Sequence, residues 1–66
     1  MTVRIGIGDA TWDLADQHDI DQVRGAFSDG MATKDTLWFE LRDGGELVIN
    51  AGQIGAVTIV DLARGG

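Results

Sequence analysis

The sequence predicts an α+β fold, with one helix packed on one face of a mostly antiparallel sheet in the order β-β-α-β-β-β. Apolar and polar residues alternate over 36–42, and the apolar-rich segment 46–49 can return beside them after a turn. Apolar residues recur at spacings of three and four over 20–31, which is the period of a helix. The 66 residues have room for a single domain over 1–66, which buries only about 60% of its unfolded surface and is expected to be marginally stable alone.

Two short strands joined by a turn are expected at the start of the chain. Apolar residues alternate with arginine and glycine over 3–7, and Trp12 and Leu14 lie on one side of a second alternating segment. The residues Gly8-Asp9-Ala10 suit a turn between them. Both apolar faces are expected to meet the same core.

A helix is expected from residue 20 to about residue 30. Asp19 is a suitable N-cap because its carboxylate can accept from free backbone amides, and Gln22 stands in the capping-box position. Gly30 can end the helix in a left-handed conformation. The stripe that faces the core consists of Ile20, Val23, Phe27 and Met31.

A hairpin follows the helix, with Leu37, Phe39 and Leu41 on its inner face and a turn at Asp43-Gly44, a pair that tolerates positive φ. The segment 51–53 then interrupts the pattern.

The glycines Gly52 and Gly55 suggest a bend or a bulge where the chain leaves one strand pairing and joins another. A last strand is expected over 54–61, and residues 62–66 are expected to form a frayed tail.

The sheet face that the helix leaves uncovered is the candidate interaction surface. Tryptophan is enriched among binding hot spots, and a domain this small gains stability by forming a homo-oligomer. Alternatively, Trp38 folds into a second small core or lies partly covered by Arg42, and strand edges offer another route to association. The expected interface residues are Trp38, Val48, Val60, Glu40 and Arg42.

The formal net charge of −6 disfavours direct binding to nucleic acid or to an anionic membrane, because the five basic residues are scattered along the chain. No apolar stretch approaches the roughly 20 residues of a membrane-spanning helix, and the first residues lack a signal-peptide pattern. A cytoplasmic protein is expected.

Five aspartates gather over residues 9–21 without a lysine or arginine among them. Such an acidic patch serves as a solvated edge that keeps the protein soluble, or as a binding surface for a basic protein partner or a cation. Its spacing is not that of a calcium-binding loop, so no metal site is expected. No cofactor is expected either, because the Gly6-Ile7-Gly8 segment lacks the third glycine and the following helix of the dinucleotide fingerprint. The patch consists of Asp9, Asp13, Asp16, Asp19 and Asp21.

Catalytic residues are not expected. The chain has no cysteine, and its single histidine, His18, is expected to be exposed to solvent beside the start of the helix. Glu40 and Glu46 are expected to be surface charges, with Glu40 paired to Arg42 or Lys34. The sequence therefore predicts that the protein is not an enzyme.

The segments 3–7, Asp9-Ala10 and 45–59, with the acidic start of the helix, resemble a family of short actinobacterial proteins, the domain of unknown function numbered 3107. The resemblance covers residues 3–60. This chain has Asn50 where a proline is usual in the family, and its segment after the helix is short. The resemblance implies a small cytoplasmic domain and no established activity.

Two classes of function remain open. The first is a non-catalytic interaction module that self-associates through its sheet and can present its acidic first half to a basic protein. The second is a small-molecule-binding domain, with an apolar pocket near Trp12 or Trp38 and the turn Gly6–Gly8.

Overall fold

The computed structural model describes residues 2–62 and confirms the α+β fold and the order of its elements. The N-terminal half contains β1 (Val3–Ile7), β2 (Ala10–Asp13) and α1 (Ile20–Thr33). The C-terminal half contains β3 (Thr36–Glu40), β4 (Glu46–Asn50), the 3₁₀ turn η1 (Ala51–Gln53) and β5 (Thr58–Asp61).

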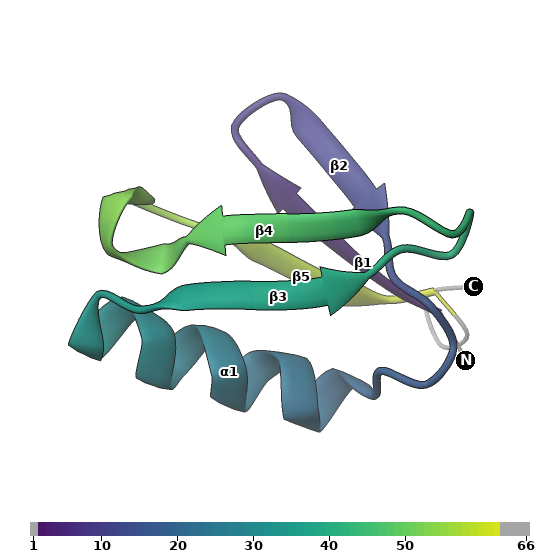
Figure 1. Ribbon diagram of the computed structural model, residues 1–66, viewed down its shortest axis with the longest axis horizontal. Helices are drawn as coiled ribbons and strands as arrows, with labels where there is room; N and C mark the ends of the chain where they lie inside the picture. The colour runs from purple at the N-terminus through teal and green to yellow at the C-terminus, as the bar shows by residue number, and fades with distance from the viewer. Residues whose placement is uncertain (1, 63–66) are drawn as a thin grey trace.

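The strands form two antiparallel sheets, one in the order β2-β1-β5 and one of β3 and β4 alone (Figure 1). The sheets meet at one corner, where Leu14 forms a bridge with Leu41 and the Ala15 N–H donates to the Glu40 carbonyl at 2.8 Å. After β4, η1 carries the chain from one sheet to the other. The change of pairing expected around Gly52 is therefore confirmed.

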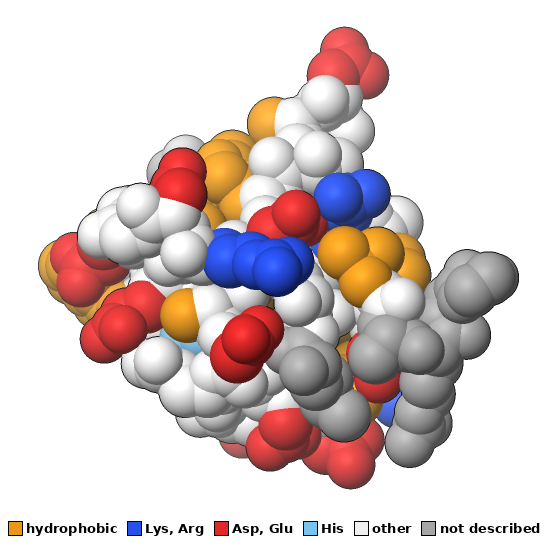
Figure 2. Space-filling model, turned by 90° about the vertical axis from the view of Figure 1, so that its right-hand side faces the viewer, with side chains coloured by type: hydrophobic (Ala, Val, Ile, Leu, Met, Phe, Trp, Pro, Cys, Tyr) orange, Lys and Arg blue, Asp and Glu red, His pale blue; other side chains and the backbone are white. Residues whose placement is uncertain are grey.

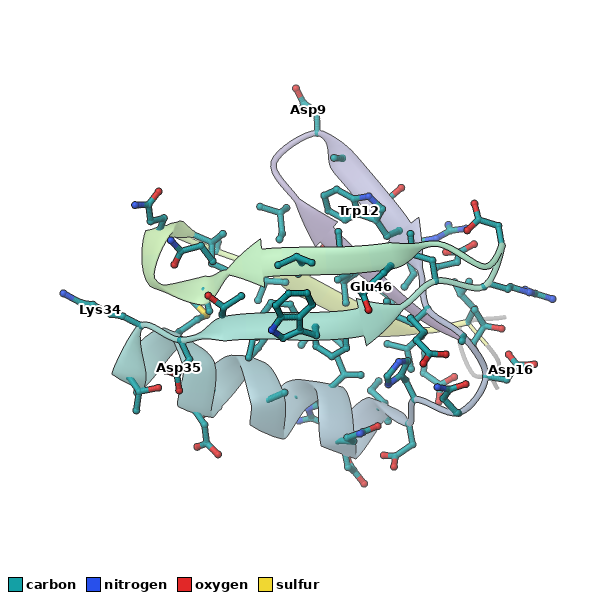
Figure 3. All side chains as sticks on the ribbon, in the orientation of Figure 1. Asp9, Trp12, Asp16, Lys34, Asp35 and Glu46 are labelled. Atoms are coloured by element: carbon teal, nitrogen blue, oxygen red, sulfur yellow. The ribbon has the colours of Figure 1, made fainter. Side chains whose placement is uncertain are left out.

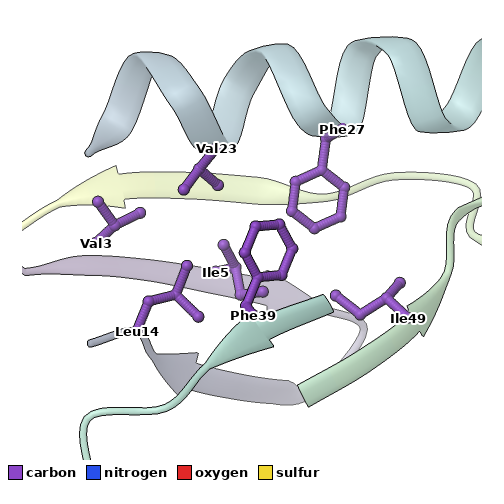
Figure 4. Close-up of a cluster of buried hydrophobic side chains, with 7 residues drawn as sticks. All are labelled: Val3, Ile5, Leu14, Val23, Phe27, Phe39 and Ile49. Atoms are coloured by element: carbon purple, nitrogen blue, oxygen red, sulfur yellow. The ribbon is translucent and has the colours of Figure 1, made fainter. Parts of the chain in front are cut away.

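The core lies between the two sheets and α1, which contacts β3, β5 and η1 (Figures 1 and 4). The rings of Phe27 and Phe39 stack with centroids 5.5 Å apart and join the helix to β3. Full burial of a valine, leucine, isoleucine or phenylalanine side chain stabilises a fold by about 1.5–3 kcal/mol. The buried cluster consists of Val3, Ile5, Leu14, Val23, Phe27, Phe39 and Ile49.

The start of the helix is as predicted. One carboxylate oxygen of Asp19 accepts from the backbone N–H groups of Asp21 and Gln22, at 2.8 and 3.0 Å. These two bonds satisfy donors that have no partner within the helix.

The predicted end of the helix at Gly30 is wrong, because α1 continues to Thr33 and the left-handed residue is Lys34, with φ 61°. Gly30 is buried inside the helix, and a Cβ there would lie 2.8 Å from Leu37 Cδ2. This glycine therefore allows α1 to approach β3 closely.

The turn predicted between β3 and β4 is confirmed, and Gly44 takes a positive φ of 98°. Its N–H donates to the Leu41 carbonyl at 3.1 Å, and the Leu41 N–H donates to the Gly45 carbonyl at 2.7 Å. This is the three-residue hairpin loop in which the third position favours glycine.

The last strand is shorter than the predicted 54–61, since only Thr58–Asp61 pair with β1. Of the tail expected over 62–66, Leu62 donates its N–H to the Thr2 carbonyl at 2.9 Å, and residues 63–66 lie outside the described residues. Within residues 2–62, no helix is long and apolar enough to cross a membrane.

Candidate interaction surface

The outer face of β3 and β4 carries two large exposed apolar side chains. Trp38 and Val48 are direct partners across the two strands, and their exposed fractions are 62% and 49%. Phe39 and Ile49, the next residues along each strand, point to the other side and are buried. The outward orientation predicted for Trp38 and Val48 is confirmed. We call this surface the ribbon face; it comprises Thr36, Trp38, Glu40, Glu46, Val48 and Asn50.

One end of the ribbon face is acidic. Glu40 and Glu46 are direct cross-strand partners, an arrangement in which like charges repel. The predicted pairing of Glu40 with Arg42 or Lys34 is wrong, because the ion pairs among residues 2–62 include neither. The Glu40 carboxylate instead accepts from the Gln17 side-chain amide at 2.9 Å. Figure 3 places Lys34 beyond the opposite end of β3 from Glu46.

Val60 does not lie on the ribbon face. It is 43% exposed on β5, beside Arg4 of β1, in the three-stranded sheet. Because both sheets turn their inner faces to one core, their outer faces point in opposite directions.

Arg42 lies in the loop after β3 and also falls outside the ribbon face. Its backbone N–H donates to the Asp13 carbonyl at 3.0 Å, and its guanidinium lies 3.4 Å from the Thr2 hydroxyl. The structure thus unites Trp38, Val48 and Glu40 of the predicted interface and separates the other two.

The five aspartates of the predicted acidic patch do not form one surface. Asp9 is at the tip of the β1–β2 hairpin, far from Asp16, which lies 3.3 Å from the Thr2 hydroxyl (Figure 3). Asp13 binds Arg4, and Asp19 caps the helix. Figure 2 shows acidic and basic side chains interspersed at the end of the molecule that carries the β3–β4 loop. Asp21 is exposed in the first turn of α1, 3.9 Å from Arg24.

His18 is half-buried, so the predicted exposure to solvent is wrong. Its Nε2 accepts the Glu40 N–H at 3.1 Å, and its ring meets Phe39 edge-on with centroids 5.5 Å apart. An imidazole that accepts at Nε2 in the neutral form carries its proton on Nδ1, and Nδ1 is buried without a hydrogen-bond partner among residues 2–62. Together with Ala15, His18 closes the outer edge of β3 at Glu40.

Within residues 2–62, β4 pairs with no strand other than β3. The Ala51 N–H donates to the Asp35 carbonyl at 2.9 Å, and the Leu41 N–H donates to the Gly45 carbonyl. These bonds fix the hydrogen-bonding phase of the ribbon, that is, which residues of β3 and β4 bond to each other through their backbones. Since this phase alternates along an antiparallel pair, the backbone groups of 47 and 49 face β3. Those of Glu46, Val48 and Asn50 point away from it.

A groove of about 330 Å³ lies between β2 and the β3–β4 loop. Trp12, half-buried against the core, and Leu41 supply its apolar wall. Asp13 is held by Arg4, whose Nε lies 2.6 Å from the Asp13 carboxylate, and this hydrogen bond keeps the pKa of Asp13 below its ordinary value. The groove is lined by Thr11, Trp12, Asp13, Leu41, Arg42 and Asp43.

The groove partly matches the pocket considered from the sequence. It lies at Trp12, as one alternative proposed, but neither Trp38 nor the turn Gly6–Gly8 lines it. The sequence pattern did not predict that residues 41–43 line the groove. They lie beside Trp12 because the Leu14–Leu41 bridge brings the two sheets together at this corner.

No group of three or more histidine, aspartate or glutamate side chains within residues 2–62 is arranged to hold a metal ion. Comparisons of the whole chain with protein-family models, with curated proteins and with solved structures found no match. The resemblance to the actinobacterial family of unknown function therefore stays a prediction.

Proposed function

We propose that this protein is a non-catalytic interaction module that self-associates through the ribbon face. The observation that carries the proposal is the pair of Trp38 and Val48, which lie side by side and exposed on an uncovered sheet face. Large aromatic side chains supply much of the binding energy of protein interfaces. Burial of this pair by a second copy removes apolar surface from water, which is favourable.

The architecture of the ribbon supports the same proposal. A two-stranded sheet is marginal by itself, and here β3 and β4 join the rest of the molecule through one bridge and the core. A partner on the outer face would cover the ribbon from the side that α1 and the other sheet leave open. Self-association would therefore add stability to the ribbon.

The test is the dissociation constant of self-association, measured by sedimentation equilibrium. Trp38→Ala is expected to weaken association by about 2 kcal/mol, which is about 30-fold in the dissociation constant. Val60→Ala is the matched control, because it shortens an exposed apolar side chain on the opposite face. Equal effects of the two substitutions would contradict the assignment of the interface to the ribbon face.

The ribbon face could instead bind a basic protein partner. The dependence of association on ionic strength distinguishes this binding from self-association. Each copy has a formal net charge of −6, so self-association is opposed by repulsion that salt screens. Binding of a basic protein to Glu40 and Glu46 would instead weaken as salt is added. We expect association to strengthen between low and moderate salt.

The groove beside Trp12 supports a second candidate function, the binding of a small molecule. Its apolar wall and the nearby guanidinium of Arg42 suit a ligand with an apolar body and an acidic group. Such a ligand is expected to shift the fluorescence of Trp12 in a Trp38→Phe variant and to raise the unfolding temperature. A screen of aromatic carboxylates that moves neither signal would contradict this function.

A further inference from the structure

We propose that His18 is a pH-sensitive latch between β3 and residues 14–19, the segment that connects β2 to α1. While its imidazole is neutral, His18 holds this segment against β3, and protonation of the imidazole releases it. The latch operates within a single copy of the chain, so it does not depend on the proposed self-association.

The contact of His18 with β3 requires the neutral imidazole. Its Nε2 accepts from the Glu40 backbone N–H at 3.1 Å, and a backbone N–H can only donate. A protonated imidazole carries an N–H on both ring nitrogens, so its Nε2–H would face the Glu40 N–H, donor against donor. Nδ1 offers no compensation, because it is buried without a hydrogen-bond partner among residues 2–62. The ring therefore has to leave this position when it takes up a proton.

The charged side chains closest to His18 in the two joined segments are acidic. Glu40 is the charged residue of β3, and Asp16 and Asp19 lie within two residues of His18 in its own segment. Carboxylates near an imidazole favour its charged form. The surroundings thus favour the proton that the hydrogen bond to Glu40 excludes.

The nearby arginines offset these charges only in part. In the first turns of α1, Arg24 lies 3.9 Å from Asp21, and both side chains are largely exposed. The Arg42 guanidinium and the Asp16 carboxylate both lie at the Thr2 hydroxyl, at 3.4 and 3.3 Å. The ion pairs among residues 2–62 include neither Glu40 nor Asp19.

In the described part of the chain, three hydrogen bonds join residues 14–19 to β3, and all of them end on Glu40. Its carbonyl accepts from the Ala15 N–H at 2.8 Å, its carboxylate accepts from the Gln17 amide at 2.9 Å, and its N–H donates to His18. Histidine is the side chain that ordinarily changes its charge between about pH 5 and pH 8, so among these three bonds that of His18 responds to pH in this range. Because Glu40 belongs to the ribbon face, release of His18 would loosen the acidic end of that surface.

Hydrogen exchange of the Glu40 amide tests the latch. Protection factors, which correct for the intrinsic effect of pH on exchange, are compared at about pH 8 and about pH 5 in dilute protein. We expect the protection of Glu40 to fall about fivefold at the lower pH, which is the effect of losing one hydrogen bond. The Phe39 amide, which faces Leu47 of β4, is the internal reference and is expected to change less than about twofold.

His18→Gln is the matched control, because the glutamine carbonyl can accept from the Glu40 N–H and does not titrate. We expect the protection of Glu40 in this variant to be the same at both pH values. An equal fall in His18→Gln and in the unmodified protein would overturn the latch, since the change would then belong to other titrating groups. Constant protection of Glu40 in the unmodified protein would overturn it as well.

The ¹⁵N chemical shifts of the His18 ring in the unmodified protein give an answer that needs no variant. At about pH 8, we expect them to show the proton on Nδ1 and none on Nε2. A proton on Nε2 would mean that the ring does not accept from Glu40, and the latch would be overturned. A protein that shows the expected tautomer and exchange but remains a monomer would contradict the proposed self-association and leave the latch in place.

Discussion

The outer faces of the two sheets have the same backbone pattern and opposite chemistry. On the three-stranded sheet, Arg4 and Asp13 are cross-strand partners and form an ion pair at 2.6 Å beside Val60. On the ribbon face, the corresponding central pair is Trp38 and Val48. One face satisfies its charged groups internally, whereas the other leaves its largest apolar side chains in water. The comparison indicates that association would gain most at the ribbon face.

The sharpest way to break this comparison is within one strand, where Phe39 faces the core and Trp38 faces solvent. Phe39→Ala removes a ring that stacks on Phe27 and is expected to cost about 3–5 kcal/mol. A domain of this size has a total stability of about 3–10 kcal/mol, so much of the variant would be unfolded. Urea unfolding followed by circular dichroism measures the loss.

Trp38→Ala is the control for that substitution. At protein concentrations below the dissociation constant, its free energy of unfolding is expected to stay within about 1 kcal/mol of the unmodified protein. A loss comparable to that of Phe39→Ala would show that Trp38 belongs to the core, and the contrast between the two sides of β3 would fail.

A smaller effect is expected on the three-stranded face, at Asp13. The hydrogen bond from Arg4 lowers the pKa of Asp13, so the folded state favours the carboxylate. Its contribution to stability is present above the ordinary aspartate pKa of about 4 and is lost as the pH falls through the lowered value. We therefore expect stability to fall less steeply below pH 4 in Asp13→Asn, as measured by thermal unfolding across pH. If the unfolding temperatures of Asp13→Asn and the unmodified protein fell equally steeply below pH 4, this role of the ion pair would be contradicted.

Local chemistry predicted much of the fold. Alternation at 36–42 identified β3 and its two faces, and Asp19 caps the helix as its side chain suggests. The end of the helix was mispredicted because the close approach of Leu37 to Gly30 is a tertiary contact. A glycine that packs and a glycine that terminates a helix have the same local signature.

The candidate site was predicted in part for a related reason. Alternation tells which side chains point outward, but it does not tell which sheet a strand joins, so Val60 was grouped with Trp38. The position of His18 over β3 depends on a contact with Glu40, 22 residues away. Such pairings follow from the corner between the sheets, which the sequence pattern does not show.

The most direct test of the account is the solution mass of the unmodified protein, measured by light scattering across a concentration series at low and moderate salt. We predict a reversible transition from monomer to dimer that shifts to lower protein concentration as salt screens the net charge of −6. A mass of one chain at every concentration and both salt levels would contradict self-association through the ribbon face.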